Sequence, residues 1–409
     1  MKKILRFAAI FTSIALYITS IFLINQPPPP PPHEVFRMSL EREDFLEDID
    51  YLIGIINENF PYSHLLYQQH GVDIQALGQT LKANAADRSK EIDYHSFKEL
   101  LYNEFFSHIQ GVGQLSLLNA QDWHYYTRAL SLPPHSIFDS VMLSMLIHNT
   151  SRLSYGPIDD AIEEYVAQRI QGEGNITTEI IEDGNIAYLK VYRMPYLINM
   201  EDALAVFSLY GQIGDFGHLI IDLRGNSGEW GLYFEELIAG PLTPTGISAE
   251  FTYHYKAGGH NLGYIENLRA ANFGIGSINP ASKDFSQFDF YFTLPHTIQP
   301  SSYQSNFNGK IWLLVDEFTQ SFAAKAANIF MQNNFATVVG ETTGGSIGNP
   351  FGRNFVVLPN TGIIFGYSPT YVIDVNGNTL EEGVSPHYFN KEGRDALDTV
   401  LDLINENVG

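Results

Sequence analysis

"KIWLLVDEFTQSFAAKAANIF", residues 310–330, places one serine between an apolar run and an alanine-rich segment. A short, continuous apolar run such as 310–316 is typical of a strand buried on both faces of a sheet. The alanines after Ser321 favour a helix, because alanine has the highest helix propensity. We therefore predict that a buried strand passes directly into a helix at Ser321. The serine would lie in the first helical turn, where the helix dipole favours developing negative charge.

The segments on either side of this stretch alternate between two patterns. Further short apolar runs, rich in β-branched and aromatic residues, predict strands at 186–192, 218–225 and 336–340. Segments with helical character separate them, at 200–213, 231–240 and 321–333. Such alternation predicts an α/β fold with a mainly parallel sheet and right-handed crossovers. Residues 353–368 predict instead a hairpin that turns at 359–362.

Two larger units follow from these patterns. Residues 40–130 read as a helical N-terminal domain: apolar residues recur at a 3.6-residue period in 43–60, Pro61 ends that run, and helices are expected at 72–87 and 94–109. Residues 175–405 form the α/β core, and the aromatic-rich segment 240–305 is long for a crossover, so we interpret it as an insertion.

The first 39 residues have the pattern of a membrane anchor and a spacer. Lys2, Lys3 and Arg6 precede an uncharged apolar run, 7–24, which as a helix spans about 27 Å, close to a bilayer core. Residues 1–26 therefore predict an anchor or a signal, and the proline-rich linker 27–39 predicts a stiff spacer. We expect a single-pass protein of the cell membrane with an extracytoplasmic domain, secreted if the segment is cleaved.

Composition excludes several classes of function. The formal net charge of −23 argues against a nucleic-acid partner, because a phosphate-binding face needs clustered Lys and Arg. The chain has no cysteine, which excludes disulfides, thiolate zinc sites and a cysteine nucleophile. We expect neither a metal nor a cofactor.

Two glycine-rich loops follow predicted strands and would lie near Ser321. Residues 222–230, "DLRGNSGEW", expose backbone N–H groups that suit an oxyanion, although a plain strand-to-helix turn is the alternative. Residues 340–349, "GETTGGSIGN", form the other loop. For the serine itself the alternative is structural, because Thr319 or Ser321 could be a simple helix N-cap.

The ordered blocks "IIDLRGNSG", "LLVDEFTQSFAAKAANIF", "VVGETTGG", "VVLPNTGIIFG" and "TLEEGVSPH" resemble the C-terminal processing (tail-specific) serine peptidases, in their tricorn-core-like branch. The resemblance extends over most of residues 40–405. It implies a Clp protease/crotonase-like core with a helical N-terminal domain, and hydrolysis of peptide bonds through a serine acyl-enzyme. Peptides or proteins would be the substrates.

The same resemblance assigns roles to particular residues. It implies that Ser321 is the nucleophile and that the N–H groups of Gly228 and Phe322 form the oxyanion hole. Glu381 matches the acidic residue that supports the catalytic base, and Glu382 is an alternative register.

The base itself departs from the family pattern. Gly113 stands where the tricorn branch has its histidine, Arg353 stands near the place of the lysine of the other branch, and Ala324 replaces an acidic residue. Arginine cannot accept a proton in a protein. Three replacements remain: His108 and His124, which we expect to serve the surface or the packing, and Lys325, which we expect to be an exposed helix lysine.

Two functions therefore stay open. The first is a serine-type endopeptidase of the tail-specific family. The second is a catalytically degenerate member that binds peptides or an apolar ligand. Ser321, Glu381 and the glycine loops favour the first, and Gly113 favours the second.

Overall fold

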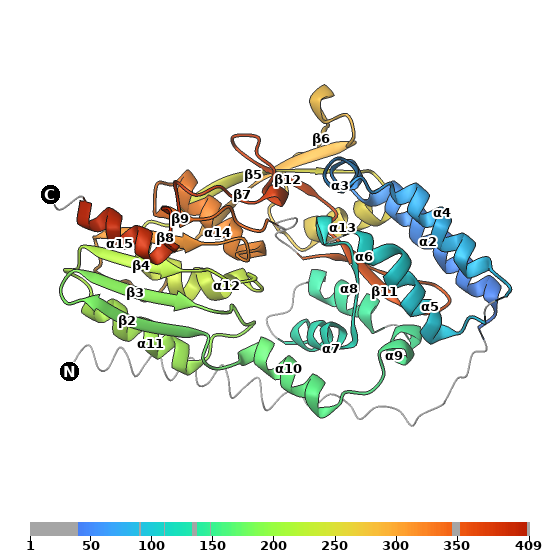
Figure 1. Ribbon diagram of the computed structural model, residues 1–409, viewed down its shortest axis with the longest axis horizontal. Helices are drawn as coiled ribbons and strands as arrows, with labels where there is room; N and C mark the ends of the chain where they lie inside the picture. The colour runs from blue at the N-terminus through green and yellow to red at the C-terminus, as the bar shows by residue number, and fades with distance from the viewer. Residues whose placement is uncertain are drawn as a thin grey trace.

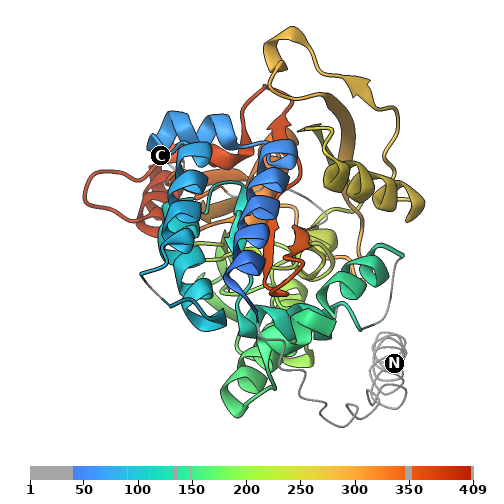
Figure 2. The same ribbon diagram turned by 90° about the vertical axis from the view of Figure 1, so that its right-hand side faces the viewer.

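The computed structural model describes residues 40–406, apart from 90, 110, 133–136, 148 and 346–351. A parallel sheet with its helices lies at one end, and the first helices of the chain lie at the other (Figure 1). Figure 2 turns that helical end toward the viewer. The predicted anchor and spacer, 1–39, fall outside the described residues, and no helix of the described part is long and apolar enough to cross a membrane.

The largest sheet has six strands in the order β13-β9-β8-β4-β3-β2. Its strands are parallel except β2, which runs antiparallel to β3. The predicted α/β fold is confirmed, and the predicted buried strands are all present. The strands are β2 (Ile176–Glu182), β3 (Ile186–Val191), β4 (His218–Asp222), β8 (Lys310–Val315), β9 (Thr337–Gly340) and β13 (Tyr388–Phe389).

Helices cover both faces of this sheet, which is why its central strands are apolar throughout. Alternate residues of β4 and β8 pack toward α11 (Met200–Gln212) and α14 (Ser321–Gln332). The other set, including Ile220 and Trp312, packs against α15 (Ala396–Glu406). The sheet therefore places the carboxyl ends of its parallel strands, and the loops that follow them, along one edge.

The expected insertion, 240–305, folds largely into a second sheet of order β12-β5-β7-β6. This sheet is antiparallel and packs against α14. Its strands are β5 (Ile247–Tyr255), β6 (Asn279–Pro280), β7 (Phe290–Ile298) and β12 (Tyr371–Asp374). A short π-helical turn, η3 (Glu235–Ala239), continues α12 (Gly231–Phe234), and α13 (Gly259–Ala270) connects β5 to β6.

A third sheet joins distant parts of the chain. The predicted hairpin forms β10 (Asn354–Val357) and β11 (Ile364–Tyr367), and β1 (Ser116–Leu117) pairs with β11. The pairing of β1 connects the helical N-terminal region to the C-terminal part of the core.

The N-terminal region is helical, as predicted, and its helices continue past residue 130. Pro61 follows the end of α2, and a short helix, α3, which the pattern did not predict, comes next. The third predicted helix contains a π turn, η1 (Tyr102–Phe106). The helices are α2 (Arg42–Asn59), α3 (Ser63–His70), α4 (Ile74–Ala86), α5 (Tyr94–Leu101), α6 (Ser107–Ile109), α7 (Ala120–Ala129), α8 (Ile137–Leu146), α9 (Asn149–Tyr155) and α10 (Asp160–Gln171).

Candidate active site

Ser321 is the first residue of α14 and has a left-handed backbone, with φ of 50°. A non-glycine residue pays a steric cost in this region, and such strain concentrates at functional sites. The helix N-cap is Gln320, whose side chain makes no capping bond. The Thr319 hydroxyl donates instead to the Leu223 carbonyl. The N-cap interpretation of Thr319 or Ser321 is therefore wrong, and the strain at Ser321 has no capping role to explain it.

The two glycine loops meet at this serine. The Ser321 N–H donates to the Gly345 carbonyl at 3.0 Å, and the Gly344 N–H donates to the Thr319 carbonyl at 2.9 Å. On the other side, Gly228 lies directly against the N–H groups that open α14, so closely that a Cβ there would clash with the backbone. The structure thus brings Gly228, Ser321 and Gly344 together at the carboxyl edge of the sheet.

The expected oxyanion donors are both engaged within the chain. The Phe322 N–H donates to the Gly228 carbonyl at 3.3 Å, and the Gly228 N–H donates to Asn226 Oδ1 at 2.8 Å. The Gly228 carbonyl therefore occupies the N–H group that a substrate oxyanion would need. Neither of the two expected donors is free in this structure, since the Gly228 N–H is held separately by the Asn226 side chain.

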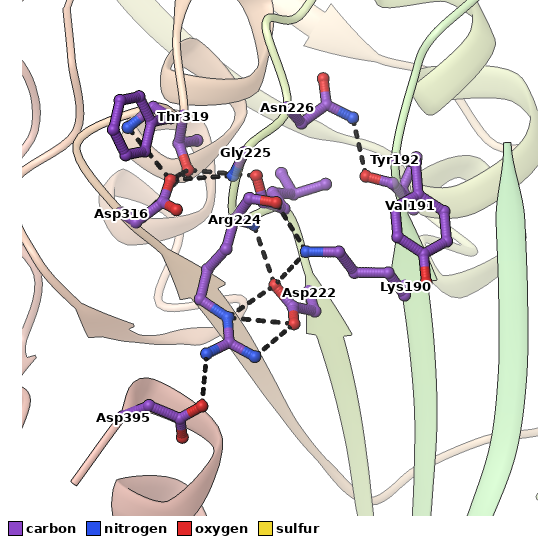
Figure 3. Close-up of polar contacts among 12 residues, drawn as sticks. Lys190, Val191, Tyr192, Asp222, Arg224, Gly225, Asn226, Asp316, Thr319 and Asp395 are labelled. Atoms are coloured by element: carbon purple, nitrogen blue, oxygen red, sulfur yellow. Dashed lines mark hydrogen bonds and ion pairs between the residues drawn. The ribbon is translucent and has the colours of Figure 1, made fainter.

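A buried polar network holds the Gly228 loop in place (Figure 3). Asp222, at the end of β4, lies between Lys190 Nζ at 3.1 Å and the Arg224 guanidinium at 2.7 Å. Burial raises the pKa of the Asp222 carboxyl, but the hydrogen bonds and charges of Arg224 and Lys190 outweigh it, so the pKa lies below its usual value. Asp222 therefore stays ionised and fixes the start of the loop.

Asp316 performs the same task at the end of β8. Its Oδ1 accepts from the Gly225 N–H at 2.9 Å and the Phe318 N–H at 3.1 Å, and it lies 2.9 Å from the Thr319 hydroxyl, whose single proton it shares with the Leu223 carbonyl. One carboxylate thus connects the Gly228 loop to the turn before Ser321, as Figure 3 shows. Sequence reasoning missed this role. The signal was present, because both "IID" and "LLVD" end a buried strand with an aspartate.

Glu381 lies behind the Gly345 loop, opposite Gly113. Its Oε1 accepts the Gly113 N–H at 2.7 Å, and its Oε2 is buried without a partner among the described residues. Burial raises the pKa of the Glu381 carboxyl to about 7, although the Gly113 N–H opposes this. The acid and the glycine that replaces the expected histidine are therefore direct neighbours.

Aromatic rings fill the space beside Gly113. A Cβ at this position would lie 2.5 Å from Tyr62 and 2.6 Å from Phe60, and the φ of 58° is one that side chains rarely adopt. The region is therefore built around a glycine, with no room for an imidazole.

Arg353 and the three candidate bases named from the sequence lie in different surroundings. Arg353 donates to Ser116 Oγ at 2.8 Å, and His108 is exposed on α6. His124 lies against the Trp123 ring, and burial lowers the pKa of its imidazole. Lys325 overturns our expectation, because it is buried, with 3% of its surface exposed. The sequence could not indicate this burial, since the strands that cover Lys325 come from the distant segment 247–298.

Comparison with the models of known families shows to which family this chain belongs. The model of peptidase family S41 matches residues 185–389, about half of the chain. This chain belongs to peptidase family S41. The matched segment contains Ser321, Gly228 and Glu381, whereas Gly113 precedes it. The resemblance to the processing peptidases is thereby confirmed.

Solved structures share the fold of this S41 chain. A putative peptidase from Parabacteroides merdae ATCC 43184 matches with a TM-score of 0.55 and 17% identity, over 89% of this chain and 96% of that one. Mature CPAF complexed with lactacystin matches with a TM-score of 0.52 and 14% identity, over 90% of this chain and 98% of that one. No curated protein sequence gives a significant match. At these identities the structural likeness concerns the fold alone.

Proposed function

We propose that this S41 protein is a serine-type endopeptidase that cleaves peptide bonds through an acyl-enzyme on Ser321. The observation that carries the proposal is the strained serine at the start of α14, with φ of 50°, between two glycine loops. Strain is retained at a position where the hydroxyl must be presented to a substrate. Peptides or proteins are the substrates that this chemistry requires.

In this reaction Ser321 Oγ attacks the substrate carbonyl carbon. The oxyanion that forms takes the N–H groups of Gly228 and Phe322, after Phe322 has left the Gly228 carbonyl and the Gly228 N–H has left Asn226 Oδ1. Glu381 is the buried acid of the site, and its carboxyl accepts the Gly113 N–H. The acyl-enzyme is then hydrolysed by water.

The N-terminal sequence supports a location at the membrane. Residues 7–24 are apolar, three basic residues precede them, and a proline tract separates them from the folded part. We place the peptidase domain outside the cytoplasm, held by this single anchor. Cell fractionation tests this: the full chain belongs in the membrane fraction, with the domain open to protease added outside, and full-length protein in the soluble cytoplasm would contradict it.

A second candidate is a non-catalytic protein that binds peptides or an apolar ligand. The packing of Phe60 and Tyr62 against Gly113 favours it, because the usual histidine cannot be accommodated there.

A fluorophosphonate probe, which reacts with activated serines, separates the two candidates. If the protein is a peptidase, the probe labels Ser321. Ser321→Ala then abolishes labelling and slows peptide cleavage by several orders of magnitude, while the unfolding temperature is unchanged. Absence of labelling, with saturable peptide binding that Ser321→Ala leaves unchanged, would establish the binding protein instead.

A further inference from the structure

Three titratable side chains lie in a row beside the first turns of α14. Lys325 of α14 places Nζ 3.2 Å from His296 Nδ1 on β7. His296 Nε2 lies 2.8 Å from Glu235 Oε1 on η3. The three groups come from three different elements, so the fold brings them together.

Lys325 has no ion-pair partner within the part of the chain that the structure describes. Its Nζ lies 4.7 Å from the centre of the Phe251 ring and 3.5 Å from the Tyr253 hydroxyl. Burial lowers the pKa of the Lys325 ammonium to about 7, and the charge of Glu235 opposes this only in part. A large fraction of the molecules therefore carries a neutral amine at neutral pH, with a lone pair that can accept a proton.

The contact with Glu235 determines the tautomer of His296. A carboxylate accepts only, so Nε2 carries the hydrogen and Nδ1 is left as an acceptor facing the lysine. Burial and the neighbouring lysine lower the pKa of the His296 imidazole, which keeps the ring neutral. His296 thus accepts one N–H of the amine without competing for its lone pair.

This cluster adjoins the serine along the helix. Lys325 is four residues after Ser321, about one turn further along α14, and its side chain leans toward the N-terminus of the helix. The ring of Phe322, the residue after the serine, lies 5.7 Å from the His296 ring, centre to centre. The first turn of α14 therefore packs against His296.

From these contacts we infer that Lys325 is the general base for Ser321, with His296 and Glu235 as its positioning residues. The inference rests on the proposed peptidase function and supplies the base that Gly113 and Arg353 cannot provide. It differs from the pattern expected from the sequence, in which a histidine or lysine from another segment fills this role.

The proton balance of the reaction is complete with this one base. As Oγ bonds to the carbonyl carbon, its proton moves to the Nζ lone pair and the carbonyl π electrons become the oxyanion. The ammonium then gives that proton to the leaving amine as the C–N bond breaks. Water repeats the sequence on the acyl-enzyme, giving one proton to Nζ, which returns it to Ser321 Oγ.

No hydrogen bond joins Nζ to Ser321 Oγ in this structure, in which Nζ faces His296 and the Gly228 carbonyl accepts from the Phe322 N–H. Proton transfer therefore requires a change of the Lys325 rotamer, in addition to the change at Gly228 that frees the Phe322 N–H. Contacts of this kind tighten when substrate binds.

The rate of fluorophosphonate labelling at Ser321, measured on the full chain from pH 5 to pH 9, tests the inference. The wild type should label faster as pH rises, with an apparent pKa near 7. Lys325→Met, of similar length, should label at least about 100-fold more slowly, the usual contribution of a general base, with an unfolding temperature equal to or above the wild type. Lys310→Met is the matched control, because Lys310 begins β8 at the opposite end from Ser321.

Two further variants separate a base from a structural lysine. Lys325→Arg keeps the positive charge but cannot accept a proton, so it should stay unlabelled. Glu235→Gln removes the charge that raises the pKa of Lys325, so it should move the labelling profile to lower pH. Wild-type labelling rates in Lys325→Met would overturn the inference alone, whereas an unlabelled wild type would remove the proposed function and the inference with it.

Discussion

Gly113 and Ser321 both have left-handed backbones, but for opposite reasons. At Gly113 the absent side chain lets Phe60 and Tyr62 pack against the backbone, so the conformation serves packing. At Ser321 the side chain is present, and in the proposed peptidase the strain serves to present its hydroxyl to the substrate. The same backbone region therefore occurs at a packed glycine and at the proposed nucleophile.

Replacing Gly113 with alanine should destabilise the fold by at least about 2 kcal/mol more than replacing Gly111. Both glycines have positive φ, but a Cβ at Gly111 meets nothing within 4 Å, whereas one at Gly113 meets two rings. The backbone cost is thus common to the two variants, and the clash is specific to one. Urea unfolding of both variants measures the difference, and equal losses would show that the rings adapt.

At the level of the elements, buried aspartates at the ends of β4 and β8 hold the loops that meet at Ser321. Asp222 connects β3, β4 and, through Arg224 and Asp395, the start of α15. The loop that supplies Gly228 is therefore fixed at its start by three elements.

Asp222→Asn should cost about 1 to 3 kcal/mol of unfolding free energy, because it leaves the partly buried Lys190 and Arg224 without their buried anion. Asp395→Asn removes the other partner of Arg224, but that carboxylate is 57% exposed and asparagine can still cap α15. Its loss should stay below about 1 kcal/mol. Chemical unfolding of the two variants checks the contrast, and similar losses would place the stabilisation elsewhere.

The sequence predicted those elements whose pattern is local. The runs ending at Asp222 and Asp316 are apolar throughout because helices cover both faces, so their strands and the loops after them could be placed. Glu381 was identified by resemblance to known motifs, and its contact with Gly113 could not be read from either segment. The burial of Lys325 was predicted wrongly, because it depends on β5 and β7, whose place above α14 no local pattern reveals.

Over the whole molecule, the helical N-terminal region and the α/β core are joined through shared apolar contacts and through Glu381. Side chains of α2 and α5, such as Phe45 and Phe97, belong to one cluster with Ile363 and Phe365 from the hairpin. Within this junction the bond from the Gly113 N–H to Glu381 is a buried polar link. Stability should therefore respond to the protonation of this carboxyl.

Glu381→Gln should be more stable than the wild type by a larger margin at pH 8 than at pH 5. The pKa of Glu381 in the folded state, about 7, lies above its ordinary value, so its contribution to stability is full at low pH and is lost as pH rises through 7. The difference between variant and wild type should grow by at most about 3 kcal/mol between these pH values. Thermal unfolding at both measures it. Glu382→Gln, which changes an exposed neighbour, is the control, and a constant difference for Glu381→Gln would refute the prediction.

The pairing of β1 with β11 also bears on how the chain is made. Ser116 lies opposite Gly366, so β1 can pair only after a partner strand some 250 residues further along the chain has been synthesised. At roughly 5 to 20 residues per second, synthesis of the intervening chain takes tens of seconds. During that interval the apolar faces of α2 and α5 lack the hairpin that covers them. The nascent helices thus expose apolar side chains until the hairpin has been synthesised. We therefore expect the folding of this protein to benefit from protection against aggregation during synthesis.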